Sequence, residues 1–231
     1  MKFQLTTLVC VLAFTGCADH AARERLGIVD STVLKSGMGA SQDEAAGAPS
    51  PQWVSAYASI RRSLGALASL QQRLDQLPRD RREYFHAKAQ CWLNAAQQAR
   101  ADRDLWGFVE EALGQAAVIT IGLQNSASLS AANPALRTVS TVRPDLWDIV
   151  NAIKADPAVA RCPHAQAPLA CAEVELMHAG HDAWRRNFSA SESRLPHIKD
   201  SLRASAETAL HCEQAASARV SFSRQAAAPA S

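Results

Sequence analysis

Apolar side chains recur every three or four residues between Pro51 and Pro78, which is the period of one face of a helix. Proline suits the first turn of a helix and stops it after its last turn, so these two prolines mark its expected ends. The positions expected on its buried face are Trp53, Tyr57, Ile60, Leu64, Leu67, Leu70, Leu74 and Leu77.

The same period continues along the chain. It predicts five further helices, over about 81–101, 105–123, 143–156, 168–184 and 195–219. The alternation typical of strands is nearly absent, apart from a weak strand pattern over 27–34. The residues expected to face the core in these helices are Tyr84, Phe85, Ala89, Trp92, Leu93, Ala96, Phe108, Val109, Ala112, Leu113, Ala116, Ile119, Cys171, Val174, Met177, Trp184, Ile198, Leu202, Ala206, Ala209 and Cys212. We therefore predict an all-α fold, a bundle of about six helices.

The segments between and around these helices set the expected domain boundaries. Residues 17–50 are rich in Ala, Gly, Ser and Asp with little apolar periodicity, which predicts a flexible tether. The helical domain is expected over 51–219, followed by a disordered tail over 220–231. Residues 124–142 form a long loop, which we expect to be either partly ordered on the surface or functional.

The N-terminus has the pattern of a secretory signal. Lys2 precedes an apolar run from Phe3 to Phe14, which is too short to span a bilayer as a helix. We expect residues 1–16 to be removed. No other stretch reaches the length of a transmembrane helix, and the chain that remains is long enough for one domain with its own core.

The end of this signal reads "LAFTGC", with small residues directly before Cys17. It resembles the signal of bacterial lipoproteins, although Phe14 stands where Leu, Val or Ile is usual. The resemblance implies that Cys17 becomes an acylated first residue and anchors the chain in a membrane. Ala18 at the next position is typical of outer-membrane sorting in that family. The alternative is an ordinary secretory signal with cleavage nearby.

Four cysteines remain beyond the signal and the proposed anchor, and an even number in an oxidising compartment predicts two disulfides. Three pairings are possible. The short span between Cys162 and Cys171 favours pairing these two, which leaves Cys91 with Cys212. A zinc site is the rival use of four cysteines, but no two of them have the CxxC spacing.

One pair of predicted helices, over 84–117, resembles a single tetratricopeptide-type hairpin. Its sequence is "YFHAKAQCWLNAAQQARADRDLWGFVEEALGQAA", and no second copy is visible. Stacked repeats need about three units to bury a continuous core, so we expect one isolated hairpin inside a non-repeat bundle.

Three segments carry a second resemblance: "AKAQCWLNAA" at 87–96, "RPDLW" at 143–147 and "ACAEVELMHAGHDAW" at 170–184. They are similar to a helical segment of proteobacterial envelope proteins, in which it precedes an OmpA-like peptidoglycan-binding domain. The resemblance implies an outer-membrane protein that faces the periplasm. No room for an OmpA-like module follows the last helix, so peptidoglycan-binding residues are not carried over.

The densest group of ionisable residues is "EVELMHAGHD", from Glu173 to Asp182. Within it Glu175, His178 and His181 recur every third residue, so they could share a helix face and offer a carboxylate and two imidazoles to a metal. The alternative is structural histidines hydrogen-bonded inside a bundle. The HExxH and GxSxG motifs and phosphate-binding loops are absent, so we expect no catalytic residues and no cofactor. We expect the five tryptophans to serve the core.

The charge balance of the chain serves only to exclude one class of partner. The 24 basic and 22 acidic residues nearly balance, and basic runs such as "RDRRE" at 79–83 lack interleaved aromatic residues. We expect no nucleic-acid partner. The leading hypothesis is a non-enzymatic scaffold or adaptor, held at the membrane through its lipid, that binds an envelope protein or a cell-wall-associated partner. A metal-dependent or hydrolytic enzyme centred on His178 and His181, and a tetratricopeptide-like peptide-binding module, are the alternatives. No pattern indicates an oligomeric state.

Overall fold

The computed structural model describes residues 20–28, 64–78 and 83–226, with only the backbone from 219 onward. Within these ranges the chain forms eight helices and no strand, which confirms the all-α prediction but exceeds the expected count of about six. Besides a short helix over 20–26, they are α4 (Leu64–Asp75), α5 (Glu83–Ala101), α6 (Phe108–Gln124), α7 (Pro144–Ala155), α8 (Pro157–Arg161), α9 (Pro163–Trp184) and α10 (Phe188–Ala226).

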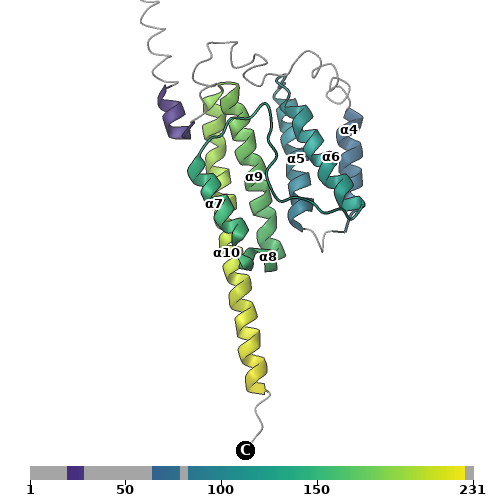
Figure 1. The fold of residues 1–231 in the computed structure, drawn as a ribbon, viewed down its shortest axis with the longest axis vertical. Helices are drawn as coiled ribbons and strands as arrows, with labels where there is room; N and C mark the ends of the chain where they lie inside the picture. Colours follow the sequence, from purple (N-terminus) through teal and green to yellow (C-terminus); the bar gives the residue numbers. More distant parts are fainter. Residues whose placement is uncertain (1–19, 29–63, 79–82, 227–231) are drawn as a thin grey trace, which may run out of the picture.

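Helix α9 lies at the centre of the bundle. It packs against α10 on one side and α5 on the other, and α5 in turn carries α6 and α4 (Figure 1). Leu169 and Leu176 of α9 belong to one core cluster, with α7, α8 and α10, whereas Val174 and Met177 belong to the second, with α4, α5 and α6. A helix that is apolar on most of its circumference is buried, and α9 is such a helix.

Prolines begin three of the helices, because the missing N–H of proline needs no partner in a first turn. They are Pro144, Pro157 and Pro163. The predicted starts of the last two long helices are wrong for a related reason. The predicted helices begin at Pro168 and near Pro196, but both prolines lie inside helices that begin one to two turns earlier, at Pro163 and Phe188.

Helix α10 is also longer than predicted at its other end. The expected disordered tail began at residue 220, whereas residues 220–226 continue α10 to Ala226; residues 227–231 lie outside the described ranges. In Figure 1 the last part of α10 projects beyond the other helices as an arm. For residues 219–226 only the backbone is described.

Part of the expected tether is packed on the domain. Ala22, Leu26 and Ile28 are buried in the first core cluster, and the Leu26 carbonyl accepts a hydrogen bond from the Arg143 N–H at 2.6 Å. Gly27 ends this helix with a φ of 59°, where the absence of a Cβ makes the left-handed conformation cheap. Residues 20–28 are therefore neither tether nor the start of a strand, and the rest of 17–50 lies outside the described residues.

The long loop between α6 and α7, residues 125–143, is ordered across α6 and α9, and we name it the strap. Leu129, Leu136 and Val139 pack on the second core cluster, and Thr138 and Ser140 are buried. A long surface loop without helices can be ordered only if its backbone and apolar side chains find partners, and this one does.

Two disulfides are present, but the favoured pairing was wrong. The bridges join Cys91 to Cys171 and Cys162 to Cys212. Cys162 lies directly before α9, and Cys171 lies nine residues further along the chain, inside that helix, so about 13 Å of helix rise separates the two. A disulfide spans at most about 7 Å between Cα atoms, which excludes the Cys162–Cys171 bridge.

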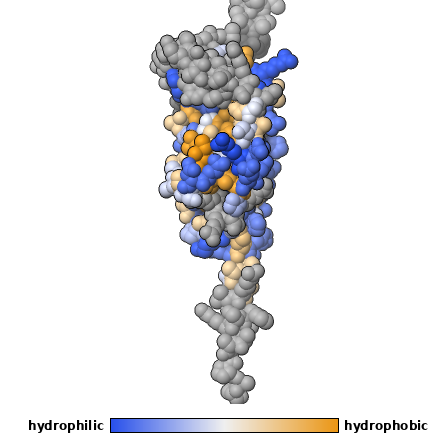
Figure 2. Space-filling model, turned by 90° about the vertical axis from the view of Figure 1, so that its right-hand side faces the viewer, coloured by the Kyte–Doolittle hydropathy of each residue, from blue (hydrophilic) through white to orange (hydrophobic). Residues whose placement is uncertain are grey.

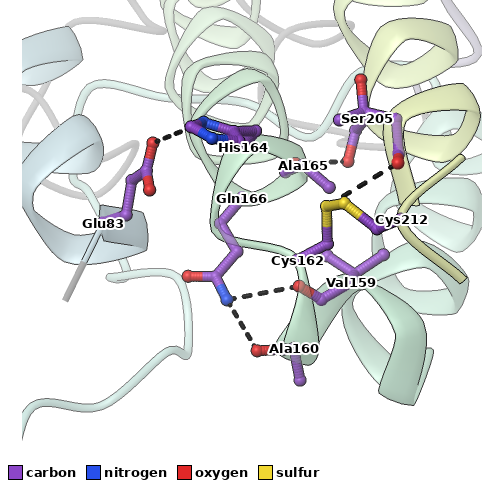
Figure 3. Close-up of a disulfide and its surroundings, with 10 residues drawn as sticks. Glu83, Val159, Ala160, Cys162, His164, Ala165, Gln166, Ser205 and Cys212 are labelled. Carbon is purple, nitrogen blue, oxygen red and sulfur yellow. Dashed lines mark hydrogen bonds and ion pairs between the residues drawn. A yellow bond between two sulfur atoms is a disulfide. The ribbon is translucent and has the colours of Figure 1, made fainter. Parts of the chain in front are cut away.

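The Cys162–Cys212 bridge ties the junction of α8 and α9 to α10 (Figure 3). Beside it the Ser205 hydroxyl of α10 donates to the Ala165 carbonyl of α9 at 2.6 Å. This cross-link and hydrogen bond hold the start of α9 against the middle of α10.

The core prediction is largely confirmed in α5 and α6, where Trp92, Leu93, Phe108 and Leu113 are fully buried. It is wrong at Ala206, which is exposed on α10. The tryptophans divide as follows: Trp92 and Trp184 are buried, Trp147 is half-buried, Trp106 is exposed, and Trp53 lies outside the described residues.

Candidate functional site

A groove of ≈ 790 Å³ lies where α5 and α10 flank α9. Both outer helices pack on α9 but not extensively on each other, so a gap remains above α9. The Cys91–Cys171 bridge lies in this groove and fixes the spacing of α5 and α9. Its other lining residues are Asn94, Gln98, Asp102, Glu175, Ala190, Ser193, Arg194, His197 and Ser201.

Most of the side chains that line the groove carry a polar group. Amides, carboxylates, hydroxyls, an imidazole and a guanidinium supply both hydrogen-bond donors and acceptors, and large apolar side chains are missing from its lining. Such a surface suits a polar, extended ligand better than an acyl chain. The face formed by α4 and α6, at the right of Figure 1, is hydrophilic with apolar atoms only in small groups between polar ones (Figure 2).

Arg194 of α10 anchors the wall of the groove. Its Nε donates to Asp182 at 2.7 Å, and its Nη1 donates to Glu175 at 3.1 Å and to Gln98 at 3.3 Å. Its Nη2 lies 3.0 Å from Nε2 of His178. These partners come from α9 and α5, so one buried guanidinium joins all three helices that form the groove.

His178 lies under Arg194 and is neutral. Burial lowers the pKa of His178 to about 2, and the positive charge of Arg194 adds to the effect. The guanidinium can only donate, so Nε2 of His178 is the acceptor and Nδ1 carries the hydrogen. Among the described residues Nδ1 has no hydrogen-bond partner.

His181 is held differently. Its Nδ1 is 2.8 Å from the Thr138 carbonyl of the strap, and its Nε2 is 2.6 Å from Oδ2 of Asp104. Burial acts to raise the pKa of Asp104, but the hydrogen bond and charge of His181 and the charge of Arg185 outweigh it and hold that pKa below its usual value. The imidazole of His181 therefore lies between two hydrogen-bond acceptors, the Thr138 carbonyl and the Asp104 carboxylate.

The predicted metal candidates do not converge on one point. Glu175 and His178 are both bound to Arg194, and His181 is bound to Asp104 and the strap. The ring nitrogens of His178 and His181 that take part in these hydrogen bonds have no lone pair free for a metal. Within the described ranges, no group of three or more His, Cys, Asp or Glu side chains could hold a metal ion. The structural alternative for the two histidines is the one that the geometry supports.

A second buried charge cluster surrounds Glu173, which is fully buried on α9. Lys88 donates to its Oε2 at 2.6 Å, and Lys154 lies 2.6 Å from its Oε1. Tyr84 donates to Oε2 at 2.8 Å. Burial, followed by the charge of Glu173, raises the pKa of Tyr84, and burial lowers the pKa of Lys88 in spite of the same carboxylate.

This second cluster also holds the strap. Lys88 donates to the Asn133 side chain at 2.9 Å, and Lys154 donates to the Ala131 carbonyl at 2.8 Å. It joins α5, α7, α9 and the strap at the end of the bundle opposite Asp104. A small cavity of ≈ 150 Å³ next to it is lined partly by Tyr84 and Lys154.

The sequence located one side of each cluster and missed the other. Glu173, His181 and Asp182 belong to the acidic and histidine-rich segment that the pattern singled out. Their partners Lys88, Asp104 and Arg194 belong to no recognisable motif, and Lys88 and Asp104 come from parts of the chain about 80 residues away. Only the packing of α5 beside α9 brings them together.

Comparison with known proteins adds no family. No protein-family model, no curated protein and no solved structure matches this chain. Within the described residues, none of the helices has both the length and the apolar character needed to cross a bilayer.

Proposed function

We propose that the chain is a lipoprotein anchored in the outer membrane through Cys17, facing the periplasm, where it serves as a non-enzymatic scaffold. In this proposal the groove between α5, α9 and α10 takes a polar, extended segment of another envelope component. The observation that carries it is this groove, with its mixed hydrogen-bonding groups and a disulfide between two of its helices.

The two disulfides support an extracytoplasmic location. Such bridges form and persist in oxidising compartments, and both join helices far apart in sequence. A secretory signal and an envelope location accord with this chemistry.

The electrostatics support a scaffold over an enzyme. An acid–base catalyst needs a titratable group within reach of a substrate. His178 and His181 are 2% and 0% exposed, and each is bound to a charged neighbour. Glu175 and Arg194 in the wall of the groove serve to join helices. Asp102 and the exposed His197 also line the groove, but neither belongs to the pair of histidines on which the hydrolytic alternative depends.

The peptide-binding alternative uses the same surface. Helices α5 and α6 pack on one another as a hairpin, and α5 supplies Asn94 and Gln98 to the groove. The likeness to a tetratricopeptide unit stays a prediction, but a peptide held along α5 is one form of the proposed function.

The test is site-specific photo-crosslinking in intact cells. A photoreactive residue at Asn94 or His197, both exposed in the groove, is expected to capture one reproducible envelope partner. The same residue at Val118, exposed on α6, is the matched control and should capture none. Ser201→Trp, which fills the groove, should abolish the adduct; an adduct that survives this change, or none at all, contradicts the proposal.

Anchoring is tested separately by the intact mass of protein extracted from membranes. We expect a chain that begins at Cys17 with a lipid adduct, and four further thiols that appear only after reduction. An unlipidated chain cut elsewhere would contradict the anchor without touching the groove.

A further inference from the structure

The short helix 20–26, the turn between α5 and α6 (102–107) and the turn between α9 and α10 (185–187) lie at one end of the bundle, which we name the anchor end. Side chains at and just after the α9–α10 turn bind both the α5–α6 turn and the short helix. Arg185 donates to Asp104 at 3.2 Å, and Arg25 donates to Glu192, near the start of α10, at 2.6 Å. In Figure 1 this end lies opposite the arm of α10.

Two large apolar side chains stand exposed side by side in the α5–α6 turn. Leu105 is 68% exposed and Trp106 is 38% exposed. Elsewhere the exposed large apolar residues lie along the sides of α6, α7 and α10. Single exposed apolar residues are ordinary, but a leucine next to a tryptophan at the tip of a turn is the pair that membrane interfaces favour.

This turn is held rigidly in place. Asp104, buried beneath it, accepts from the Trp106 N–H at 2.8 Å. It is also bound to His181 of α9 and to Arg185 of the α9–α10 turn. Gly107, with a φ of 98°, allows the chain to leave the turn directly into α6. The apolar pair is therefore presented outward without the entropic cost of ordering a free loop.

The length of chain before the described fold indicates what covers this pair. Only Ala18 and Asp19 lie between Cys17 and His20, the first residue of the docked helix. A lipid on Cys17 is therefore attached within three residue steps, about 11 Å, of that helix. Residues 20–28 pack on the domain, so this short connection cannot be extended by unrolling a tether. A lipid-anchored chain of this structure must hold its anchor end next to the bilayer.

Charge does not dominate this surface. Arg25, Arg143 and Arg185 are paired with Glu192, Asp145 and Asp104 respectively. These paired arginines attract anionic lipid weakly. Arg103, exposed in the same turn as Leu105 and Trp106, adds an attraction to lipid phosphates beside the insertion of the two apolar side chains.

We propose that the anchor end is a membrane-docking surface, in which Leu105 and Trp106 insert into the headgroup region of the leaflet that holds the lipid. The proposal rests on the proposed acylation of Cys17 for its location, but the surface binds a bilayer through its own side chains. Docking directs α10, about 58 Å long, away from the membrane into the periplasm.

The test uses the mature chain from residue 17 with Cys17→Ala, so that no acyl chain contributes. Vesicles of phosphatidylethanolamine and phosphatidylglycerol are floated with this protein and with two double variants of it. Leu105→Ser/Trp106→Ser should lower the vesicle-bound to free ratio about tenfold, because two large apolar side chains no longer insert. Val118→Ser/Ile121→Ser, at similarly exposed positions on the side of α6, should bind as the parent does. Thermal unfolding of each variant checks that the fold is intact.

Brominated lipids give an independent readout. They should quench part of the tryptophan fluorescence of the parent, and Trp106→Phe, which keeps an apolar side chain, should bind but lose that quenching. A parent that does not float, a Leu105→Ser/Trp106→Ser variant that floats equally well, or quenching that survives Trp106→Phe each overturns the docking surface. These results do not depend on acylation, which the intact mass measures, so the two proposals can fail separately.

Discussion

His178 and His181 lie one turn apart on α9 and sandwich Phe108, whose ring centroid is 4.6 Å from each imidazole. Their surroundings give them opposite roles. His178 is kept neutral by burial and accepts from Arg194, which can only donate, whereas His181 lies between two acceptors. At the scale of single residues, the same residue type one turn apart on one helix thus meets opposite hydrogen-bond partners.

The neutral state of His178 predicts a pH-dependent stability. Its pKa is about 2 in the fold and 6.5 in the unfolded chain, so below pH 6.5 the unfolded state takes up a proton that the folded state does not. The contribution of His178 to the free energy of unfolding is therefore fully present above pH 6.5. It declines as the pH falls, by up to about 1.4 kcal/mol per pH unit. Urea unfolding of His178→Gln between pH 7.5 and 4.5 should show a shallower decline than the wild type.

The matched control for this experiment is a destabilised variant that removes no titratable group. Val150→Ala opens a small cavity in the buried side of α7 and should lower the unfolding free energy at every pH while keeping the wild-type slope. Equal slopes for His178→Gln and the wild type would contradict the assignment of His178 as neutral.

Glu173 predicts a large cost for removing one buried charge. Glu173→Gln leaves the ammonium groups of Lys88 and Lys154 without their carboxylate, and breaking a buried pair in this way costs about 3–5 kcal/mol. Glu213→Gln breaks the exposed pair with Arg161 and should cost less than about 1 kcal/mol. Chemical denaturation of both variants at pH 7 measures the difference; similar values would mean that the Glu173 cluster adds no net stability.

At the scale of elements, the strap is the segment whose conformation depends most on its neighbours. Ser140 donates from its N–H to the Gly180 carbonyl of α9 at 3.2 Å, and Thr138 donates from its hydroxyl to Glu111 of α6 at 2.6 Å. A side chain at position 180 would occupy the space of the strap backbone. Gly180 is therefore required by this close approach, although it lies in a helix, where glycine is unfavourable.

Gly180→Ala tests this contact. Its Cβ would lie 2.3 Å from the Ser140 carbonyl oxygen and 2.7 Å from the Val139 side chain, so the strap must move, at a cost of about 1–3 kcal/mol. Gly114→Ala in α6 is the matched control, because a Cβ there meets nothing within 4 Å and the helix gains about 0.5–1 kcal/mol. The midpoint temperature of thermal unfolding should fall for Gly180→Ala and rise for Gly114→Ala. An equal fall for both variants would show that the close approach of the strap is not the reason for the glycine at position 180.

At the scale of the whole molecule, α9 and the two disulfides hold the bundle together. One bridge joins α9 to α5, and the other joins the start of α9 to α10, over sequence separations of 80 and 50 residues. The groove lies between the two helices that are tied to α9, so the bridges limit how far it can open.

The connectivity predicts distinct results for paired substitutions. Cys91→Ala/Cys171→Ala and Cys162→Ala/Cys212→Ala each remove one bridge, at about 4 kcal/mol in the chain-entropy model. Cys162→Ala/Cys171→Ala should lose both bridges and leave two free thiols, whereas the pairing favoured by sequence spacing predicts the loss of one bridge and no thiol. Thiol titration under denaturing conditions, together with non-reducing peptide mapping, distinguishes the two.

Helices with a regular apolar period were well predicted, because burial of one face is a local property of the pattern. The starts of the helices that contain Pro168 and Pro196 were predicted less well. A proline inside a helix is tolerated when packing compensates for the lost hydrogen bond. The site was predicted only as the segment around Glu173 to Asp182. The groove and Arg194 were missed, because three helices far apart in sequence form them.

The sequence by itself predicted the helical character of the described residues, the faces of α5 and α6 that are buried, and the presence of two disulfides. The helical period and the number of cysteines can be read directly from the order of residues, so no tertiary contact is needed to find them. Only the tertiary structure decided which cysteines pair, that Leu105 and Trp106 stay exposed, and that the two histidines serve packing. Those properties depend on distances between segments that share no sequence neighbourhood, and the packing of α5 and α10 on α9 sets those distances.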